Sequence, residues 1–171
     1  MNVTSAGANK LLKKLTEEKE RILINERHNM SYVLADGETP DIPDYNFADT
    51  SAKIAEIDDK IVTIKHAINK VNTTNMIDVQ GKKMTIDTVL VKMAQLNQRK
   101  NMLQDMRNSQ KKVRLGARGL SSNAIVEYKY ANYDIDEVNN EYLQTDATIT
   151  AMQLALDKFN ASYEFEVEIT L

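Results

Sequence analysis

The sequence contains no cysteine and no tryptophan, and its 171 residues include only two prolines and five glycines. Without cysteine the chain has no disulfide and no thiolate metal ligand, which fits a reducing compartment, and we expect a cytoplasmic protein. The scarcity of proline and glycine predicts long, uninterrupted secondary-structure elements. Because apolar runs are short throughout, we expect neither a signal peptide nor a transmembrane segment.

Neither acidic nor basic residues are in large excess. The chain carries 22 basic and 25 acidic residues, a net charge of −3. This balance gives no general affinity for nucleic acid or for anionic lipid, so any such binding has to be local. The length fits one domain, residues 1–171, that can bury a core if its helices pair.

Motifs that carry catalysis or bind cofactors are absent from the sequence. The chain has two histidines, His28 and His66, and neither has a glutamate three positions before it, as the helical ligands of di-iron bundles would. H-E-x-x-H, the phosphate-binding G-x-x-x-x-G-K and the G-x-S-x-G nucleophile turn do not occur. We therefore predict a protein that is not an enzyme, with no catalytic, cofactor-binding or metal-binding residues.

One segment offers oxygen ligands for a hard cation. The sequence ADGETPDIPDYNF holds four carboxylates, both prolines and a glycine; the carboxylates are Asp36, Glu38, Asp41 and Asp44. Their spacing is not that of an EF-hand, and such residues are typical of any solvated turn. We interpret the segment as an acidic loop.

The dominant pattern is a pair of apolar seams in which successive members are alternately three and four residues apart. One comprises Ile135, Val138, Tyr142, Thr145, Ile149, Met152, Leu156, Phe159 and Tyr163, and the other Ile54, Ile57, Ile61, Ile64, Ile68 and Val71. This heptad spacing is typical of coiled coils and helical bundles. It predicts a mainly α fold, an antiparallel four-helix bundle or coiled-coil hairpins, with a small β hairpin and a C-terminal strand.

Periodicity, caps and breakers predict where these elements lie. Helices are expected at about 5–32, 51–75, 86–108 and 136–161, with loops at 35–48 and 109–123. Thr50 or Ser51 is expected to cap the second helix and Thr85 the third.

Three β elements complete the prediction. Residues 76–85 are expected to form a hairpin around Gln80 and Gly81, and 126–131 a short strand. The tail YEFEVEITL alternates apolar residues with glutamates, and we expect it to pair with the hairpin. The strand at 126–131 then needs a partner in the acidic loop or in another subunit.

A basic run is the best candidate for a binding site. Between Met106 and Val126 there is no acid, and the cations are Arg107, Lys111, Lys112, Arg114 and Arg118. They could contact phosphates, although a charge match with the acidic loop, within the chain or between subunits, is the favoured interpretation. Beyond the run, Tyr128, Tyr130 and Tyr133 lie close to Lys129 and suggest a stacking surface for single-stranded nucleic acid, but the alternation fits an ordinary strand better.

Several motifs resemble those of a family of small uncharacterised bacterial helical proteins, some of which are labelled septicolysin. The resemblance rests on the acidic loop and on residues around the expected hairpin, which are Ile68, Asn69, Asn72, Thr74, Asn75, Gly81, Thr85 and Ile86. Met93 and Ala94 stand where that family typically has an arginine and an aspartate. The resemblance implies the helical fold, and the septicolysin label implies a membrane-active lysin.

These observations lead to an ordered set of functional hypotheses. The first is a non-enzymatic, self-associating helical scaffold or protein-interaction module, a homo-oligomer whose unpaired strands another copy would cover. The alternative is polyanion or nucleic-acid binding through residues 107–118. A lysin ranks lowest, because the seams are narrow stripes that suit other helices better than lipid.

Overall fold

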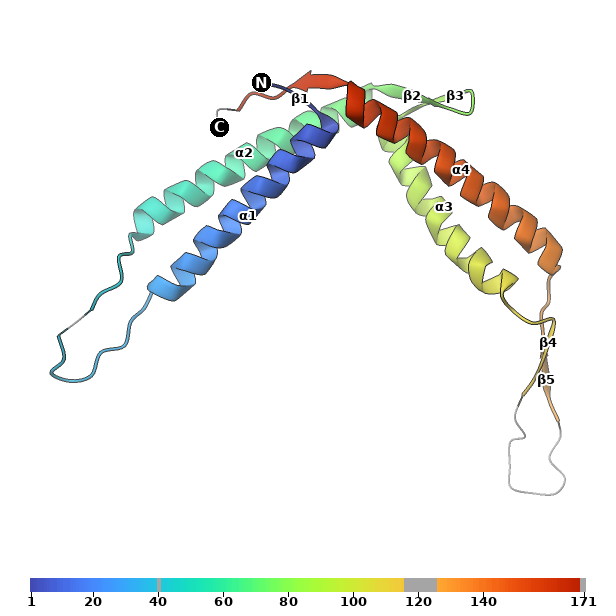
Figure 1. Cartoon of the computed structure of the whole chain (residues 1–171), viewed down its shortest axis with the longest axis horizontal. Helices are drawn as coiled ribbons and strands as arrows, with labels where there is room; N and C mark the ends of the chain where they lie inside the picture. Colours follow the sequence, from blue (N-terminus) through green and yellow to red (C-terminus); the bar gives the residue numbers. More distant parts are fainter. Residues whose placement is uncertain (40, 116–125, 170–171) are drawn as a thin grey trace. The chain divides into compact units, whose positions relative to one another are not determined.

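The computed structural model describes residues 1–39, 41–115 and 126–169. Within these ranges the chain forms four long helices and three two-stranded antiparallel sheets (Figure 1). It divides into two compact units, Met1–Asn75 with Asp157–Leu171 and Met76–Leu156, which are described here one at a time. The predicted mainly α fold, with a small β hairpin and a C-terminal strand, is confirmed.

The helix bounds lie close to those expected from the sequence. The first unit contains β1 (Asn2–Thr4), α1 (Ser5–Asn29), α2 (Phe47–Thr74), the end of α4 (Ile135–Ser162) and β6 (Glu164–Glu166). The second contains β2 (Met76–Val79), β3 (Lys82–Thr85), α3 (Ile86–Arg107), β4 (Lys112–Arg114), β5 (Tyr128–Tyr130) and most of α4.

The second helix begins earlier than expected. Neither Thr50 nor Ser51 caps α2; the cap is Asn46, whose side-chain oxygen accepts a hydrogen bond from the Asp49 amide at 3.2 Å. Asparagine is as good an N-cap as serine or threonine, so the sequence offers several starts, and the earliest is used.

In the first unit, α1 and α2 lie side by side as an antiparallel hairpin (Figure 1). The α2 seam faces α1, because Ile57, Ile64 and Val71, each seven residues from the next, are buried. Ala8 and Leu15 of α1 complete the core. At its edge the Lys19 ammonium binds both carboxylate oxygens of Asp58, at 2.6 and 2.7 Å.

The C-terminal strand pairs with the N-terminus rather than with the hairpin. In an antiparallel ladder β6 lies against β1, with Val3 opposite Phe165, and Val167 donates its amide to Met1 O at 2.8 Å. Val167 is 1% exposed and joins the α1–α2 core. The expected pairing of the tail with residues 76–85 is therefore wrong. The tail pairs instead with β1, a strand that was not expected from the sequence.

In the second unit, side chains of α3 and α4 contact one another between residues 99–107 and 141–146. Val138, Thr145 and Met152 of the α4 seam are buried, as are Val89 and Leu103 of α3. Two ion pairs bridge the helices: Arg99 with Glu141, through two hydrogen bonds of 2.9 and 3.1 Å, and Lys100 with Asp146. The predicted seam is thus the inner face of this hairpin.

The hairpin expected at 76–85 is present as β2 and β3. Gln80 and Gly81 both have positive φ, 53° and 82°, as a two-residue turn between twisted strands requires. The Asp78 carboxylate accepts the Gly81 amide at 2.8 Å and closes the turn. The strand leads into α3 through Thr85, which caps the helix as predicted.

The strand expected at 126–131 is also present, as β5, but its partner was not foreseen. It pairs with β4, residues 112–114, inside a stretch expected to be a loop. The expected partners, the acidic loop or another subunit, are wrong, because the chain provides the partner itself. Over the described ranges, no helix combines the length and apolarity needed to cross a membrane.

Candidate functional site

Part of the basic run, β4, and two of the tyrosines, in β5, form a two-stranded ribbon between α3 and α4. Cα register places Lys112 opposite Tyr130 and Arg114 opposite Tyr128. The ladder continues past both strands, since Leu115 donates to Glu127 O at 2.8 Å and Ala131 to Lys111 O at 3.1 Å. β-Branched and aromatic residues at 113, 128 and 130 favour this extended conformation.

The register decides which side chains share a face. Residues opposite each other in an antiparallel pair project from the same side of the ribbon, and their neighbours along the strand project from the other. One side therefore holds Lys112, Arg114, Tyr128 and Tyr130, here called the cation–tyrosine face. Val113 and Lys129 belong to the opposite side. Every residue of β4 and β5 is exposed.

Cations and rings contact one another on this face. The Lys112 Nζ lies 4.1 Å from the Tyr128 ring centroid and 5.3 Å from that of Tyr130. The two ring centroids are 6.4 Å apart with the rings tilted by 51°, so neither ring covers the other. Exposed cation–π contacts of this kind contribute about 0.5–1 kcal/mol each, enough to orient Lys112 without fixing it.

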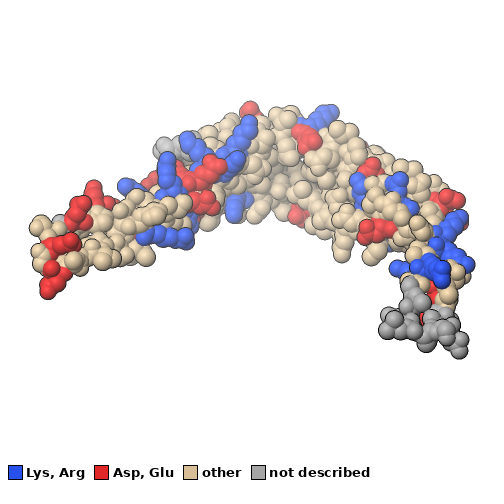
Figure 2. All heavy atoms as spheres, turned by 60° about the horizontal axis from the view of Figure 1, so that its bottom comes forward, with Lys and Arg blue, Asp and Glu red and all other residues tan. Residues whose placement is uncertain are grey.

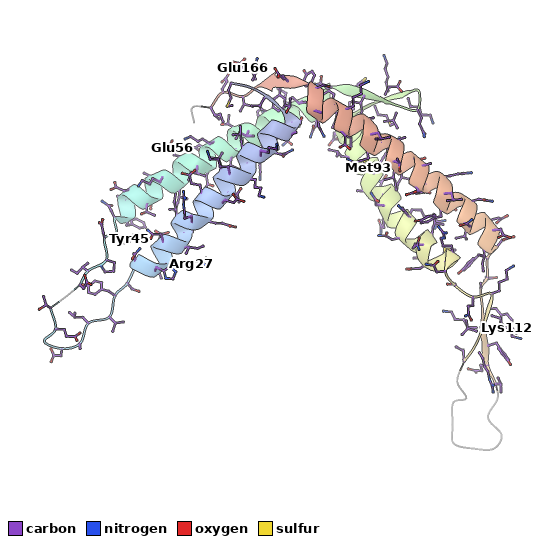
Figure 3. The ribbon with its side chains drawn as sticks, in the orientation of Figure 1. Arg27, Tyr45, Glu56, Met93, Lys112 and Glu166 are labelled. Carbon is purple, nitrogen blue, oxygen red and sulfur yellow. The ribbon has the colours of Figure 1, made fainter. Side chains whose placement is uncertain are left out.

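Among the described residues, the cations of the ribbon have no carboxylate partner. Lys111, Lys112, Arg114 and Lys129 form no ion pair with any residue that the structure describes. Figure 2 shows Lys and Arg side chains gathered in this part of the surface, and Figure 3 places Lys112 on the ribbon. The ribbon therefore presents positive charge to solvent although the chain as a whole is slightly acidic.

The base of the ribbon is tied to the helices. At the end of α3 the Arg107 guanidinium lies 4.3 Å from the Tyr142 ring centroid of α4. Tyr133 donates its hydroxyl to Met106 O at 3.0 Å. Between these anchors and the ribbon lies a cavity of about 340 Å³ whose lining includes Ser109, Gln110, Val113, Lys129, Tyr130 and Tyr133.

The five cations named from the sequence thus have different settings. Lys112 and Arg114 are on the cation–tyrosine face, and Lys111 extends the ladder on the opposite side. Arg107 belongs to α3 and packs on Tyr142. Arg118 lies outside the described residues. Of the tyrosines, Tyr133 is not in the strand, so the stacking candidates are Tyr128 and Tyr130 alone.

Four other ionisable residues of the second unit, Arg99, Lys100, Glu141 and Asp146, have structural partners. The bidentate hydrogen bond from the Arg99 guanidinium lowers the pKa of the Glu141 carboxyl and raises that of Arg99 itself. The hydrogen bond to Asp146 likewise raises the pKa of Lys100. These pKa shifts favour the ionised forms of Arg99, Lys100 and Glu141, so the ion pairs hold the two helices together.

The acidic loop does not gather its carboxylates into a site. Asp36, Glu38, Asp41 and Asp44 are all exposed, and Glu38 accepts a hydrogen bond from the Ala35 amide at 3.1 Å. No group of three or more potential metal ligands occurs in the described part of the chain. The loop belongs to the first unit and the ribbon to the second, so the charge match between them stays a prediction.

Comparison with known proteins places the chain in a family. A family model described as a family of unknown function, DUF6847, matches residues 13–157. The chain belongs to this family. The sequence motifs predict a family without an assigned function, and the matching family is of that kind, whereas the septicolysin label has no support from the family or from the structural comparison. No curated protein matches the chain.

A solved structure shares the fold of this DUF6847 member. It is the crystal structure of a functionally unknown conserved protein from Corynebacterium diphtheriae, with a TM-score of 0.68 and 14% sequence identity, covering 97% of this chain and 100% of that one. At this identity the likeness shows the fold alone. Function has to be argued from the residues of this chain.

Proposed function

We propose that this protein is a non-enzymatic binding module whose β4–β5 ribbon binds polyanions. The observation that carries the proposal is the cation–tyrosine face, on which Lys112 and Arg114 are exposed and have no carboxylate partner among the described residues. Lys111 and Lys129 add charge to the same ribbon from its other side. Several cations on one small element form a local positive field that net charge alone does not reveal.

The ribbon has features that favour binding over a purely structural role. A hairpin that served only to connect α3 and α4 would not require exposed tyrosines together with cations that form no ion pair with the described residues. Its base, by contrast, is fixed through Arg107 and Tyr133, so the face is presented on a supported element. Supported sites order fewer groups when a ligand binds, which lowers the entropic cost of binding.

Charge reversal on the ribbon tests the proposal. We expect the wild-type protein to be retained on a heparin column at low salt and to elute as salt rises, because phosphate or sulfate binding releases counterions. Lys112→Glu/Arg114→Glu should elute at clearly lower salt or flow through. Elution position is the measurement.

The β2–β3 hairpin provides a matched control. Lys82→Glu/Lys83→Glu makes the same change of charge at two exposed positions of a two-stranded element of the same unit. If this variant loses retention as strongly as the ribbon variant, only net charge matters and the ribbon has no special role. A wild-type protein that passes through heparin at low salt would also contradict the proposal.

Self-association is the second candidate, and a specific observation favours it. Leu143 and Leu154 on α4 are exposed and eleven residues apart, which puts them on one helix face, and Val91 and Met102 on α3 repeat this arrangement. Apolar residues in line on an outer helix face suit a second copy of the chain. The two strands that first suggested an oligomer, β5 and β6, each have a partner within the chain, so they no longer support self-association.

Light scattering distinguishes a self-associating protein from a monomer. If the outer leucines form an interface, the wild-type mass should exceed that of one chain, and Leu143→Lys/Leu154→Lys should return it to the monomer. The control is Gln144→Lys, which adds a lysine at an exposed position of the same helix. Gln153 and Asp157 are not used for this control because their side chains have interaction partners. A monomeric wild type at high concentration removes this candidate.

A further inference from the structure

We propose that the cation–tyrosine face binds single-stranded nucleic acid, with bases stacked on Tyr128 and Tyr130 and phosphates on Lys112 and Arg114. This inference rests on the proposed polyanion-binding function and names its ligand class. It follows from the register of the ribbon, which the sequence does not reveal.

The tyrosine rings are available for stacking. Tyr128 is 42% exposed and Tyr130 is 61% exposed, and their tilt of 51° leaves ring faces open. Phe159 and Tyr163 provide the contrast, since their rings stack on each other at 4.7 Å with an interplanar angle of 17°. In that pair each ring covers one face of the other, whereas each ribbon tyrosine keeps a ring face that a base can cover.

Each ring has its own cation directly across the ladder. Lys112 is opposite Tyr130 and Arg114 is opposite Tyr128, so the face repeats one unit, a ring beside a cation, twice along the ribbon. A nucleic-acid strand repeats the complementary unit, a base beside a phosphate. Two consecutive nucleotides of an extended strand therefore match two consecutive pairs of the ribbon.

The ligand has to be single-stranded for this arrangement to be used. In a duplex the faces of the bases are covered by their neighbours, and a ribbon in the major groove contacts base edges and phosphates. The exposed rings of Tyr128 and Tyr130 would then have no base face to stack on. A sulfated polysaccharide likewise offers charge without a base to stack, so it should depend on the cations and be indifferent to the tyrosines.

The contact between Lys112 and the rings does not block the site. Its Nζ lies over Tyr128 and near Tyr130 while no anion is present, on a flexible side chain at the surface. A phosphate attracts the ammonium more strongly than an exposed ring does. We therefore expect Lys112 to move to the phosphate when a base covers the ring.

The test measures three ligands on the same variants. Fluorescence anisotropy of a labelled oligothymidylate and of a labelled duplex gives two affinities, and elution from heparin reports binding through charge alone. Tyr128→Leu/Tyr130→Leu removes the rings and keeps every cation. Tyr32→Leu is the matched control, since Tyr32 is an exposed tyrosine outside the ribbon.

We expect the wild type to bind the single strand more tightly than the duplex. The double leucine variant should lose about fivefold or more in oligothymidylate affinity for each ring removed, with heparin elution unchanged. Replacing Lys112 by Gln should reduce the slope of log affinity against log salt by about 0.7 on a single strand. Because the chain has no tryptophan, quenching of tyrosine fluorescence gives an independent readout of stacking.

The outcomes separate this inference from the function on which it rests. Retention on heparin with no preference for the single strand, or a double leucine variant that binds oligothymidylate as the wild type does, overturns the inference and leaves polyanion binding intact. Absence of both heparin and oligothymidylate binding overturns the two together. Circular dichroism of each variant shows that a loss of binding is not a loss of fold.

Discussion

Replacing Leu103 by alanine is expected to lower the free energy of unfolding by about 2–5 kcal/mol. Leu103 is 0% exposed and is among the few fully buried residues of α3, whose other buried positions, Ile86 and Val89, lie in its first turns. Its removal leaves a cavity between two helices that have little other core to collapse into it. The midpoint of urea unfolding, followed by helical circular dichroism, measures the loss.

Met102 supplies the control for this prediction. It is adjacent in sequence but 56% exposed, so Met102→Ala changes helix propensity little and removes little buried surface. We expect its unfolding midpoint to stay within about 0.5 kcal/mol of the wild type. If Leu103→Ala behaves like Met102→Ala, the packing of α3 on α4 described above is wrong.

The helices were predictable because their signals are local and repeated. The seam in α2 recurs over six members and that in α4 over eight, with a ninth, Tyr163, directly after the helix, and each buried member, such as Ile64 or Met152, lies where heptad spacing predicts. The start of α3 was predictable because Thr85 is an N-cap residue placed directly before an apolar stripe. Repetition makes such predictions robust to a single exception such as Thr145.

The β1–β6 and β4–β5 pairs were not predictable, for the opposite reason. Asn2–Thr4 and Lys112–Arg114 have three residues each, too few to establish a period of two. Each partner lies far along the chain, and no local pattern states which strand it will meet. Where the turn itself fixes the pairing, as at Gln80 and Gly81, the hairpin could be predicted.

The candidate site shows both situations at once. Its cations and tyrosines could be identified from the sequence, because a basic run without acidic residues and an alternating strand pattern are both local features of the sequence. Their common face could not be identified, because it depends on the pairing of Lys112 with Tyr130 rather than with a neighbour. A shift of that register by one residue would place Lys129 beside the other cations and separate them from the rings.

The C-terminal segment is expected to contribute strongly to stability through its pairing with the N-terminus. Ending the chain after Tyr163 removes β6 and the buried side chain of Val167, whose burial alone contributes about 1.5–3 kcal/mol. Because 1 kcal/mol shifts the melting temperature of a chain of this size by about 2–4 °C, we expect melting to fall by about 4–10 °C. Glu168→Ala, at an exposed neighbour, should leave it unchanged.

A pair of engineered cysteines tests the register itself, since the natural chain has none. Asn2 and Glu166 lie opposite each other, flanked by the Met1–Val167 pair that exchanges two hydrogen bonds of 2.8 Å, so Asn2→Cys/Glu166→Cys should oxidise to a disulfide. The crosslink should raise the melting temperature, because it joins residues far apart in the unfolded chain. Failure to crosslink, together with unchanged melting of the truncated protein, would show that β6 does not pair with β1.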